Sequence, residues 1–184
     1  WRGDNRTICH SMWPCDWSVA VSMFKKDDVI QLTDKVISTE EQLETFQNMS
    51  TYVLNIGGGV AATNCLIDGT NYTSKDRDFF LEISPFNESF LFGFDFKNFR
   101  APILSARGMD MFMMINCTFT NNYNSFDFPI ITFNNVTIIC ANATISNNTV
   151  NSTSIIGLST AIIGLFNSSI ENNQQKSKGP VPLF

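Results

Sequence analysis

The chain has 184 residues, of which 43% are hydrophobic and 16% charged, and its formal net charge is −5. This composition is typical of a globular chain rather than a disordered one, and the length fits one compact domain. With only twelve Lys and Arg, a basic phosphate-binding surface is not expected, which excludes nucleic acid as a partner. The longest apolar stretch, residues 154–166, is shorter than the ~20 residues that cross a bilayer, so no membrane span is predicted.

The first residues are predicted to form a cap. Residues 1–28 contain the three tryptophans and two of the five cysteines, and apolar content of this kind is suited to covering the open end of a repeat structure. The chain opens on Trp1 without an apolar leader, which indicates a mature product or a fragment.

Two strands and a short helix are predicted next. Residues 29–32 and 52–56 read as strands because they combine β-branched and apolar side chains. Between them, Ser38 and Glu41 have the spacing of a capping box ahead of Leu43 and Phe46, which predicts that a short helix begins there.

From residue 64 onward the chain repeats itself. Segments beginning at Asn64, Asn116, Asn142 and Asn167 share a template of Asn, a small residue, any residue, a large apolar residue, and then Asn or Gly. A segment beginning at Phe94 fits the same frame without the leading Asn. The large apolar residues are spaced 29, 23, 26 and 25 apart, and we expect them to stack in one internal column: Ile67, Phe96, Phe119, Ile145 and Ile170.

The repeat predicts an all-β fold, a right-handed parallel β-helix (solenoid) with an N-terminal cap and one short helix. Within each segment apolar and polar residues alternate, as in a strand with one buried face. The Asn and Gly residues that follow adopt left-handed backbone angles readily, which suits a corner between strands. The Leu-x-x-Leu-x-Leu signature of leucine-rich repeats is missing. We expect a single domain over residues 1–173, with the cap in 1–28 and the coils in 29–173, followed by a tail over 174–184.

Two segments carry a resemblance to known proteins. Tyr52-Val-Leu-Asn-Ile-Gly-Gly-Gly59, followed by Leu66-Ile-Asp-Gly69, resembles the opening coils of the pectin-lyase-like right-handed β-helix superfamily. Phe119-Thr-Asn-Asn122 is similar to the Phe-x-x-Asn repeat of surface proteins of the polymorphic outer-membrane type. The likeness covers about residues 29–173. Because this superfamily contains lyases, hydrolases, adhesins and structural proteins, the resemblance implies a fold and leaves the function open.

N-glycosylation sequons are far more frequent than chance allows. Twenty Asn and thirty-three Ser and Thr would produce about 3.6 Asn-x-Ser/Thr triplets by chance, and ten occur, none with Pro in the middle. Asn- and Thr-rich turns are the alternative source of such triplets. N-linked glycans imply exposed sites on an extracellular chain of a eukaryotic secretory pathway. The predicted acceptors are Asn5, Asn48, Asn71, Asn87, Asn116, Asn135, Asn142, Asn147, Asn151 and Asn167.

The five cysteines leave two interpretations open. Cys65 and Cys117 share an inward position two coils apart, roughly 10 Å, which is too far for a direct bridge. Cys117 and Cys140 lie on neighbouring coils, and Cys65 has a cap cysteine as its candidate partner. The alternative is that the inward cysteines are small core residues. The disulfide candidates are therefore Cys9, Cys15, Cys65, Cys117 and Cys140.

Catalytic chemistry is not predicted. After residue 101 the only acidic residues are Asp110, Asp127 and Glu171, at positions that do not match between coils, whereas glycoside hydrolysis needs paired carboxylates. The single histidine, His10, falls in the cap. We therefore expect no enzyme activity, no metal site and no cofactor.

These features favour a glycosylated extracellular structural protein that assembles end to end with copies of itself into a filament, sheath or surface coat. The tail supplies the candidate subunit contacts Val181, Leu183 and Phe184, because Gly179 and two prolines prevent it from forming a helical cap. A surface adhesin or carbohydrate-binding module is the second hypothesis, and a polysaccharide lyase or hydrolase is the third.

Overall fold

The computed structural model of the protein describes residues 24–33, 35–73, 79–84, 88–126, 128–151 and 154–176. These residues form a mostly β structure with one α-helix. Every pairing between the described strands is parallel. The all-β class predicted from the sequence is therefore confirmed.

The N-terminal part is organised around two long strands. β3 pairs on one side with two shorter strands and on the other with β5. The helix α2 connects β2 to β3, and a short 3-10 turn follows β3. The elements are β1 (Val29–Leu32), β2 (Val36–Ile37), α2 (Glu40–Asn55), β3 (Gly59–Asp68), η1 (Gly69–Asn71), β4 (Leu81–Ile83) and β5 (Ser89–Lys97).

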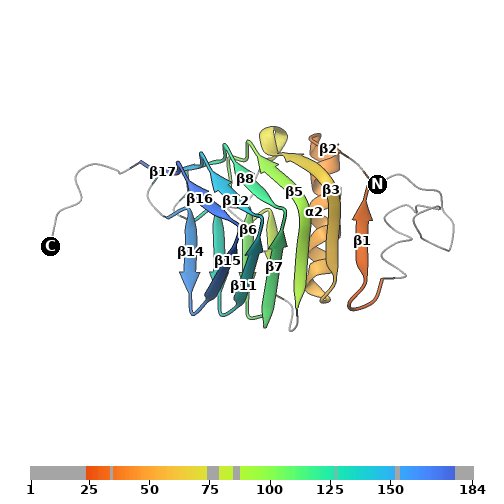
Figure 1. The fold of residues 1–184 in the computed structure, drawn as a ribbon. Coiled ribbons are helices and arrows are strands. Elements are labelled where there is room, and N and C mark those ends of the chain that lie inside the picture. The colour runs from red at the N-terminus through yellow and green to blue at the C-terminus, as the bar shows by residue number, and fades with distance from the viewer. Residues whose placement is uncertain are drawn as a thin grey trace.

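After β5 the chain forms three successive layers of four short strands, and each layer lies against the one before it (Figure 1). The first is β6 (Leu104–Arg107), β7 (Met111–Ile115), β8 (Thr118–Thr120) and β9 (Tyr123–Asn124). The second is β10 (Ile131–Asn134), β11 (Thr137–Ala141), β12 (Thr144–Ser146) and β13 (Thr149–Val150). The third is β14 (Ile156–Ser159), β15 (Ile162–Phe166), β16 (Ser169–Glu171) and β17 (Gln174–Gln175).

Equivalent strands of the three layers pair with one another. They build one sheet in the order β4-β6-β10-β14, one in the order β9-β13-β17, and a larger sheet that divides at β5. The first half of β5 pairs with β7, which continues to β11 and β15, and its second half pairs with β8, which continues to β12 and β16.

The predicted column of large apolar residues is confirmed by the register of the strands. Ile67 is the partner of Phe96, and Phe96 is the partner of Phe119. Phe119 is in turn the partner of Ile145, and Ile145 of Ile170. The first four side chains are buried, whereas Ile170 is 46% exposed. The rings of Phe96 and Phe119 stack at 4.9 Å between centroids.

The sequence prediction was wrong about residues 52–56. Val29–Leu32 forms a strand as expected, but Tyr52–Asn55 is the last turn of the 16-residue helix α2. The reason is spacing: Leu43, Phe46, Met49, Val53 and Leu54 recur at helical intervals and are all buried, and this pattern overrides the β-branched character of the last turn. Half of the segment that carried the pectin-lyase-like resemblance is therefore helical.

The start of the helix also differs by one residue from the prediction. Thr39, not Ser38, is the N-cap, and its Oγ1 accepts from the Gln42 backbone N–H at 3.3 Å. The Gln42 side chain accepts from the Thr39 backbone N–H at 3.3 Å, which completes a capping box. Gly57 ends the helical region with φ +82, a conformation that glycine adopts without strain.

Other boundaries shift as well. Gln174–Gln175 pairs with β13 as strand β17, so the last layer extends past residue 173, where the tail was predicted to begin. Most of the predicted cap, residues 1–23, lies outside the described residues. No helix in the described part of the chain is long and apolar enough to cross a membrane.

Candidate assembly surfaces

One corner of each layer is formed by an asparagine in the left-handed conformation. Asn116, Asn142 and Asn167 have φ of 51°, 51° and 48° and occupy equivalent positions before β8, β12 and β16. Asparagine tolerates this region because its short side chain hydrogen-bonds locally. All three side chains are exposed. The three sequon asparagines thus form a row of equivalent exposed positions on successive layers.

These three side chains form a hydrogen-bonded ladder. Asn142 donates from Nδ2 to Asn116 Oδ1 at 3.1 Å, and Asn167 donates from Nδ2 to Asn142 Oδ1 at 2.6 Å. An N-linked sugar replaces one hydrogen of Nδ2 and leaves the other able to donate. The ladder is therefore compatible with a glycan at any one rung, but adjacent sugars crowd because paired strands lie only about 4.8 Å apart.

The repeat itself explains why sequons are so frequent. Five predicted acceptors occupy left-handed corners, the residue after each is buried or half-buried, and the next is the Thr or Ser that begins a strand. An Asn at the corner and a Thr or Ser two residues later, at the start of the strand, together make an Asn-x-Ser/Thr triplet. The structural repeat therefore produces sequons whether or not they are glycosylated. The five are Asn116, Asn135, Asn142, Asn147 and Asn167.

The other predicted acceptors are scattered. Asn48 is exposed on helix α2, Asn71 is exposed in η1, and Asn151 is half-buried. Asn5 and Asn87 lie outside the described residues.

A second asparagine column, which was not predicted from the sequence, faces inward: two of its side chains are buried, and the third, Asn173, is half-buried. Asn122, Asn148 and Asn173 directly follow the corner residues Asn121, Asn147 and Asn172. The signal that could have found the column is the Asn-Asn pair, which recurs in all three layers with the corner residue first.

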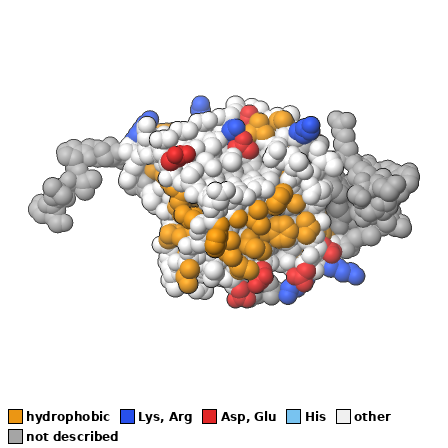
Figure 2. Space-filling model, viewed as in Figure 1, with side chains coloured by type: hydrophobic (Ala, Val, Ile, Leu, Met, Phe, Trp, Pro, Cys, Tyr) orange, Lys and Arg blue, Asp and Glu red, His pale blue; other side chains and the backbone are white. Residues whose placement is uncertain are grey.

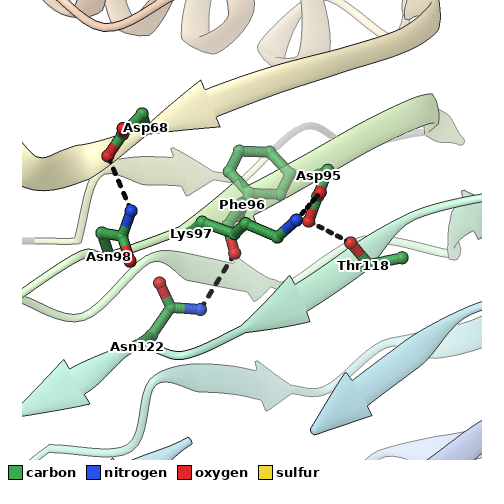
Figure 3. A network of polar contacts seen from close by, with 7 residues as sticks. All are labelled: Asp68, Asp95, Phe96, Lys97, Asn98, Thr118 and Asn122. Atoms are coloured by element: carbon green, nitrogen blue, oxygen red, sulfur yellow. Dashed lines mark hydrogen bonds and ion pairs between the residues drawn. The ribbon is translucent and has the colours of Figure 1, made fainter. Parts of the chain in front are cut away.

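Each buried asparagine connects three layers. Asn148 donates from Nδ2 to Phe119 O at 2.8 Å and to Asn173 Oδ1 at 2.9 Å. Its Oδ1 accepts from the backbone N–H and from Nδ2 of Asn122, both at 3.0 Å. Asn122 donates in the same way to Phe96 O at 3.0 Å (Figure 3). These bonds satisfy backbone groups that the turn leaves without strand partners.

The outer side of this part of the molecule is polar. Figure 3 shows Asp95 between Lys97, whose Nζ lies 2.6 Å from the carboxylate, and Thr118, whose hydroxyl donates to it. Asp68 accepts from Thr70 and from Asn98 Nδ2. Burial alone would raise the pKa of Asp68, but these hydrogen bonds hold the pKa below its ordinary value.

The last layer exposes its inward-facing residues. Leu158, Leu165 and Ile170 are 52%, 46% and 46% exposed. Their strand partners in the preceding layer are, in the same order, Phe133, Cys140 and Ile145, and each of these side chains is at most 2% exposed. The core column therefore continues to the surface at this end of the described structure. The predicted contact residues Val181, Leu183 and Phe184 lie outside the described residues.

The described cysteines are core residues. Cys65, Cys117 and Cys140 are buried free thiols, so no bridge joins Cys117 to Cys140, and the core-residue interpretation applies to these three. Cys140 is the partner of Met114, whereas Cys117 lies at the corner before β8 and donates to Leu91 O at 3.5 Å. Burial raises the pKa of Cys65 and Cys140 to about 11 and that of Cys117 to about 12. Cys9 and Cys15 lie outside the described residues.

One small pocket opens beside the polar corners. It has a volume of about 330 Å³ and is lined by Thr70, Asn98, Phe99, Arg100, Asn121 and Tyr123. The Tyr123 ring faces Lys176, whose Nζ lies 5.4 Å from the ring centroid. The Tyr123 hydroxyl donates to Asn151 at 3.1 Å. Within the described part of the chain, no group of three or more His, Cys, Asp or Glu side chains is placed to hold a metal ion.

The comparisons with family models, curated proteins and solved structures found no match to the chain. The function must therefore be argued from the molecule itself.

Proposed function

We propose that the chain is a right-handed parallel β-helix and that it serves as an extracellular, glycosylated structural subunit that assembles end to end. The fold proposal is supported by three layers with the same strand order and parallel pairing between equivalent strands. The hand follows from the strong right-handed preference of connections between parallel strands.

The likeness to surface proteins of the polymorphic outer-membrane type gains a physical basis. In Phe119-Thr-Asn-Asn122 the phenylalanine fills the core column, and Asn122 belongs to the buried ladder. Ile145 with Asn148 and Ile170 with Asn173 repeat this pairing. The spacing of a large apolar residue and an asparagine three positions later is thus what a layer of this kind requires.

The observation that carries the assembly proposal is the exposed last layer. Leu158, Leu165 and Ile170 lie in line with a buried core, and the edges of their strands have no partner among the described strands. An uncovered strand edge with apolar side chains invites a further strand. We propose that this strand comes from another copy, whose β1 or β2 supplies it, because each of these strands pairs only with β3 among the described strands. Contact between unlike surfaces does not close on itself and yields a filament.

The test is a substitution in the last layer. Leu165→Ser with Ile170→Thr should leave the monomer folded, because both side chains are about half exposed there, and should prevent filaments in electron micrographs. Ser169→Thr, in the same strand as Ile170 but facing outward, is the matched control.

Deleting residues 179–184 tests the tail as connector, with monomers or short oligomers expected. A wild-type chain that stays monomeric at high concentration would contradict end-to-end assembly.

Secretion and glycosylation are supported by the exposure of the sequon asparagines, seven of which are exposed among the described residues. Because the repeat also produces sequons for structural reasons, occupancy has to be measured. Intact mass of material from a eukaryotic secretory host, before and after enzymatic deglycosylation, should show the loss of several glycans. Unchanged mass would refute the glycoprotein proposal. Incomplete occupancy along Asn116, Asn142 and Asn167 is expected from crowding.

A carbohydrate-binding or adhesive module is the second candidate, favoured by the pocket beside Tyr123. An aromatic ring, two asparagine amides and Arg100 are groups that bind sugars and their carboxylates. A glycan array with wild type and Tyr123→Ala should show binding that the variant loses if this function holds.

A further inference from the structure

The outer face of one branch of the large sheet, the branch that contains β7, β11 and β15, is apolar, whereas the other branch is polar. Along β1, β3, β5, β7, β11 and β15, buried inward residues alternate with residues that point outward. Figure 2 shows the resulting hydrophobic surface over β5, β7, β11 and β15. The outward positions, which we call the apolar face, are Val29, Gln31, Gly59, Ala61, Phe90, Phe92, Met111, Met113, Ile115, Thr137, Ile139, Ala141, Ile162, Gly164 and Phe166, of which only Gln31 and Thr137 are polar.

None of these positions carries a charge, and the strand registers join them into continuous rows. Phe90 is the partner of Met113, and Met113 of Ile139. In the next row, Phe92 is the partner of Ile115, and Ile115 of Ala141. At the end of these rows, Ile162 and Phe166 are 71% and 60% exposed. The face therefore extends over several strands rather than consisting of isolated apolar side chains.

The same layers show what an ordinary solvent face of this fold contains. On the other branch of the same sheet, beyond its division at β5, the outward positions of β8, β12 and β16 are occupied by Thr, Ser and Glu. On the four-stranded sheet, β10 presents Thr132 and Asn134 outward. Because the repeat tolerates threonine at outward positions elsewhere, the fold does not require the apolar residues of β7 and β11.

Glycine positions keep the apolar face flat. A Cβ on Gly59 would lie 2.2 Å from Cζ of Phe90, so the phenylalanine ring lies across the glycine. A Cβ on Gly164 would lie 3.2 Å from Cε2 of Phe166. Rings that lie along the sheet produce a level surface, which suits contact with another level surface.

We propose that the apolar face binds the apolar face of a second copy, side by side and related by a two-fold axis. Six strands about 4.8 Å apart and about five residues of ~3.3 Å each give a face of roughly 450 Å². Two such faces bury roughly 900 Å², close to the lower limit of about 1,000 Å² for a specific contact. The pairing is therefore weak and depends on concentration.

Charge favours a second copy over a charged partner. Each chain carries a formal charge of −5, so copies repel one another, and a contact made through a face without charged side chains avoids placing like charges opposite each other. The lateral contact also leaves the last layer free. It therefore adds a second direction of association to the end-to-end assembly proposed above, and turns single filaments into paired ones.

The experiment isolates the lateral contact by using chains whose end contact is blocked by Leu165→Ser and Ile170→Thr. In that background, sedimentation equilibrium over a wide concentration series should show monomer and dimer. Adding Met113→Thr and Ile139→Thr should weaken dimerisation at least tenfold, because these partners lie at the centre of the face and threonine suits an outward strand position. Thr144→Ser, on the polar branch of the sheet, is the control and should leave dimerisation unchanged. Circular dichroism checks that each variant is folded.

Three results would overturn the proposal. The first is an end-blocked chain that stays monomeric throughout the series, and the second is a dimer that the Met113 and Ile139 substitutions leave intact. The third is flotation with neutral phosphatidylcholine vesicles that these substitutions abolish, which would assign the face to a lipid surface. Because the end contact is blocked throughout, failure here leaves the end-to-end proposal to its own test.

Discussion

The core column is covered at one end of the described structure and exposed at the other. At the first layers, Ile37 and Ile67 belong to a core that helix α2 covers with Leu43, Phe46 and other buried side chains. At the last layer, Ile170 continues the column and is 46% exposed. Each layer is stabilised mainly by its neighbours, so the contribution of a core residue depends on whether a neighbour is present on both sides.

Aromatic packing shows how the helix replaces a layer. The Phe46 ring lies 6.0 Å from Phe80 in a stacked arrangement and 5.4 Å from Phe94 in a tilted one. Phe80 in turn contacts Phe99 at 4.9 Å. A helical side chain thus joins the aromatic cluster that the strands supply, and the first layers need no further strand over this part of the core.

The largest expected difference comes from truncating one residue at each end. Phe46→Ala should lower the free energy of unfolding by about 3 to 5 kcal/mol, because it leaves a cavity among aromatic rings. Leu165→Ala should cost less than about 1 kcal/mol, because its side chain is 46% exposed in the monomer. Urea denaturation at low protein concentration measures both. Equal losses would mean that the last layer is covered in solution.

The sequence predicted the fold best where the spacing of large apolar residues is most regular. The spacing of Ile67, Phe96, Phe119 and Ile145 predicted their stacking because a core column can accept only large apolar residues at a fixed place in each layer. Local composition failed at residues 52–55, where tertiary burial of Val53 and Leu54 decides in favour of the helix. The apolar face was also missed, because alternation alone does not say what occupies the outward positions.

The asparagines show a different limit of sequence reasoning. The Asn-Asn pairs after the strands were predicted as turns, and Asn121 and Asn147 do have left-handed angles, but Asn122 and Asn148 were not recognised as buried. A polar residue next to a turn is ordinarily expected to face water. In the structure these amides replace strand hydrogen bonds between layers. Their acceptors, Phe96 O and Phe119 O, lie in the preceding layer, a long-range contact that the local sequence does not indicate.

The inward-facing asparagines allow the same comparison between an inner layer and the last layer, with a smaller expected change in the free energy of unfolding. Asn148→Ala should destabilise the fold by about 3 kcal/mol, because it leaves the Phe119 carbonyl and the Asn122 backbone N–H without partners in the interior. Asn173→Ala should cost about 1 kcal/mol, because its groups lie in the last layer, where water can replace them. Thermal or urea unfolding ranks the two.

A charged variant sharpens this prediction through its pH dependence. An ionised carboxylate introduced by Asn148→Asp can accept from Asn122 but cannot donate to the Phe119 carbonyl. Burial should raise its pKa above the unfolded value of about 3.9. The destabilisation of the variant relative to wild type should therefore shrink as the pH falls toward 4. A loss that does not change with pH would contradict the hydrogen bond to Phe119.

Cys117 is a fully buried side chain between the two ends, and it should make the stability depend on pH in the alkaline range. Burial raises its pKa from 9.0 to about 12. A folded-state pKa above the unfolded value means that the protonated thiol contributes stability that is present below pH 9 and lost as the pH rises toward 12. Each pH unit in that window corresponds to about 1.4 kcal/mol. Cys117→Ala should therefore reduce, by roughly that slope, the alkaline decline in the free energy of unfolding.

At neutral pH iodoacetamide should label Cys117 only after unfolding, because the thiolate is the reactive form. Rapid labelling of the native chain at Cys117, or an alkaline decline that the substitution leaves unchanged, would show that this thiol is less buried than its position between two layers requires.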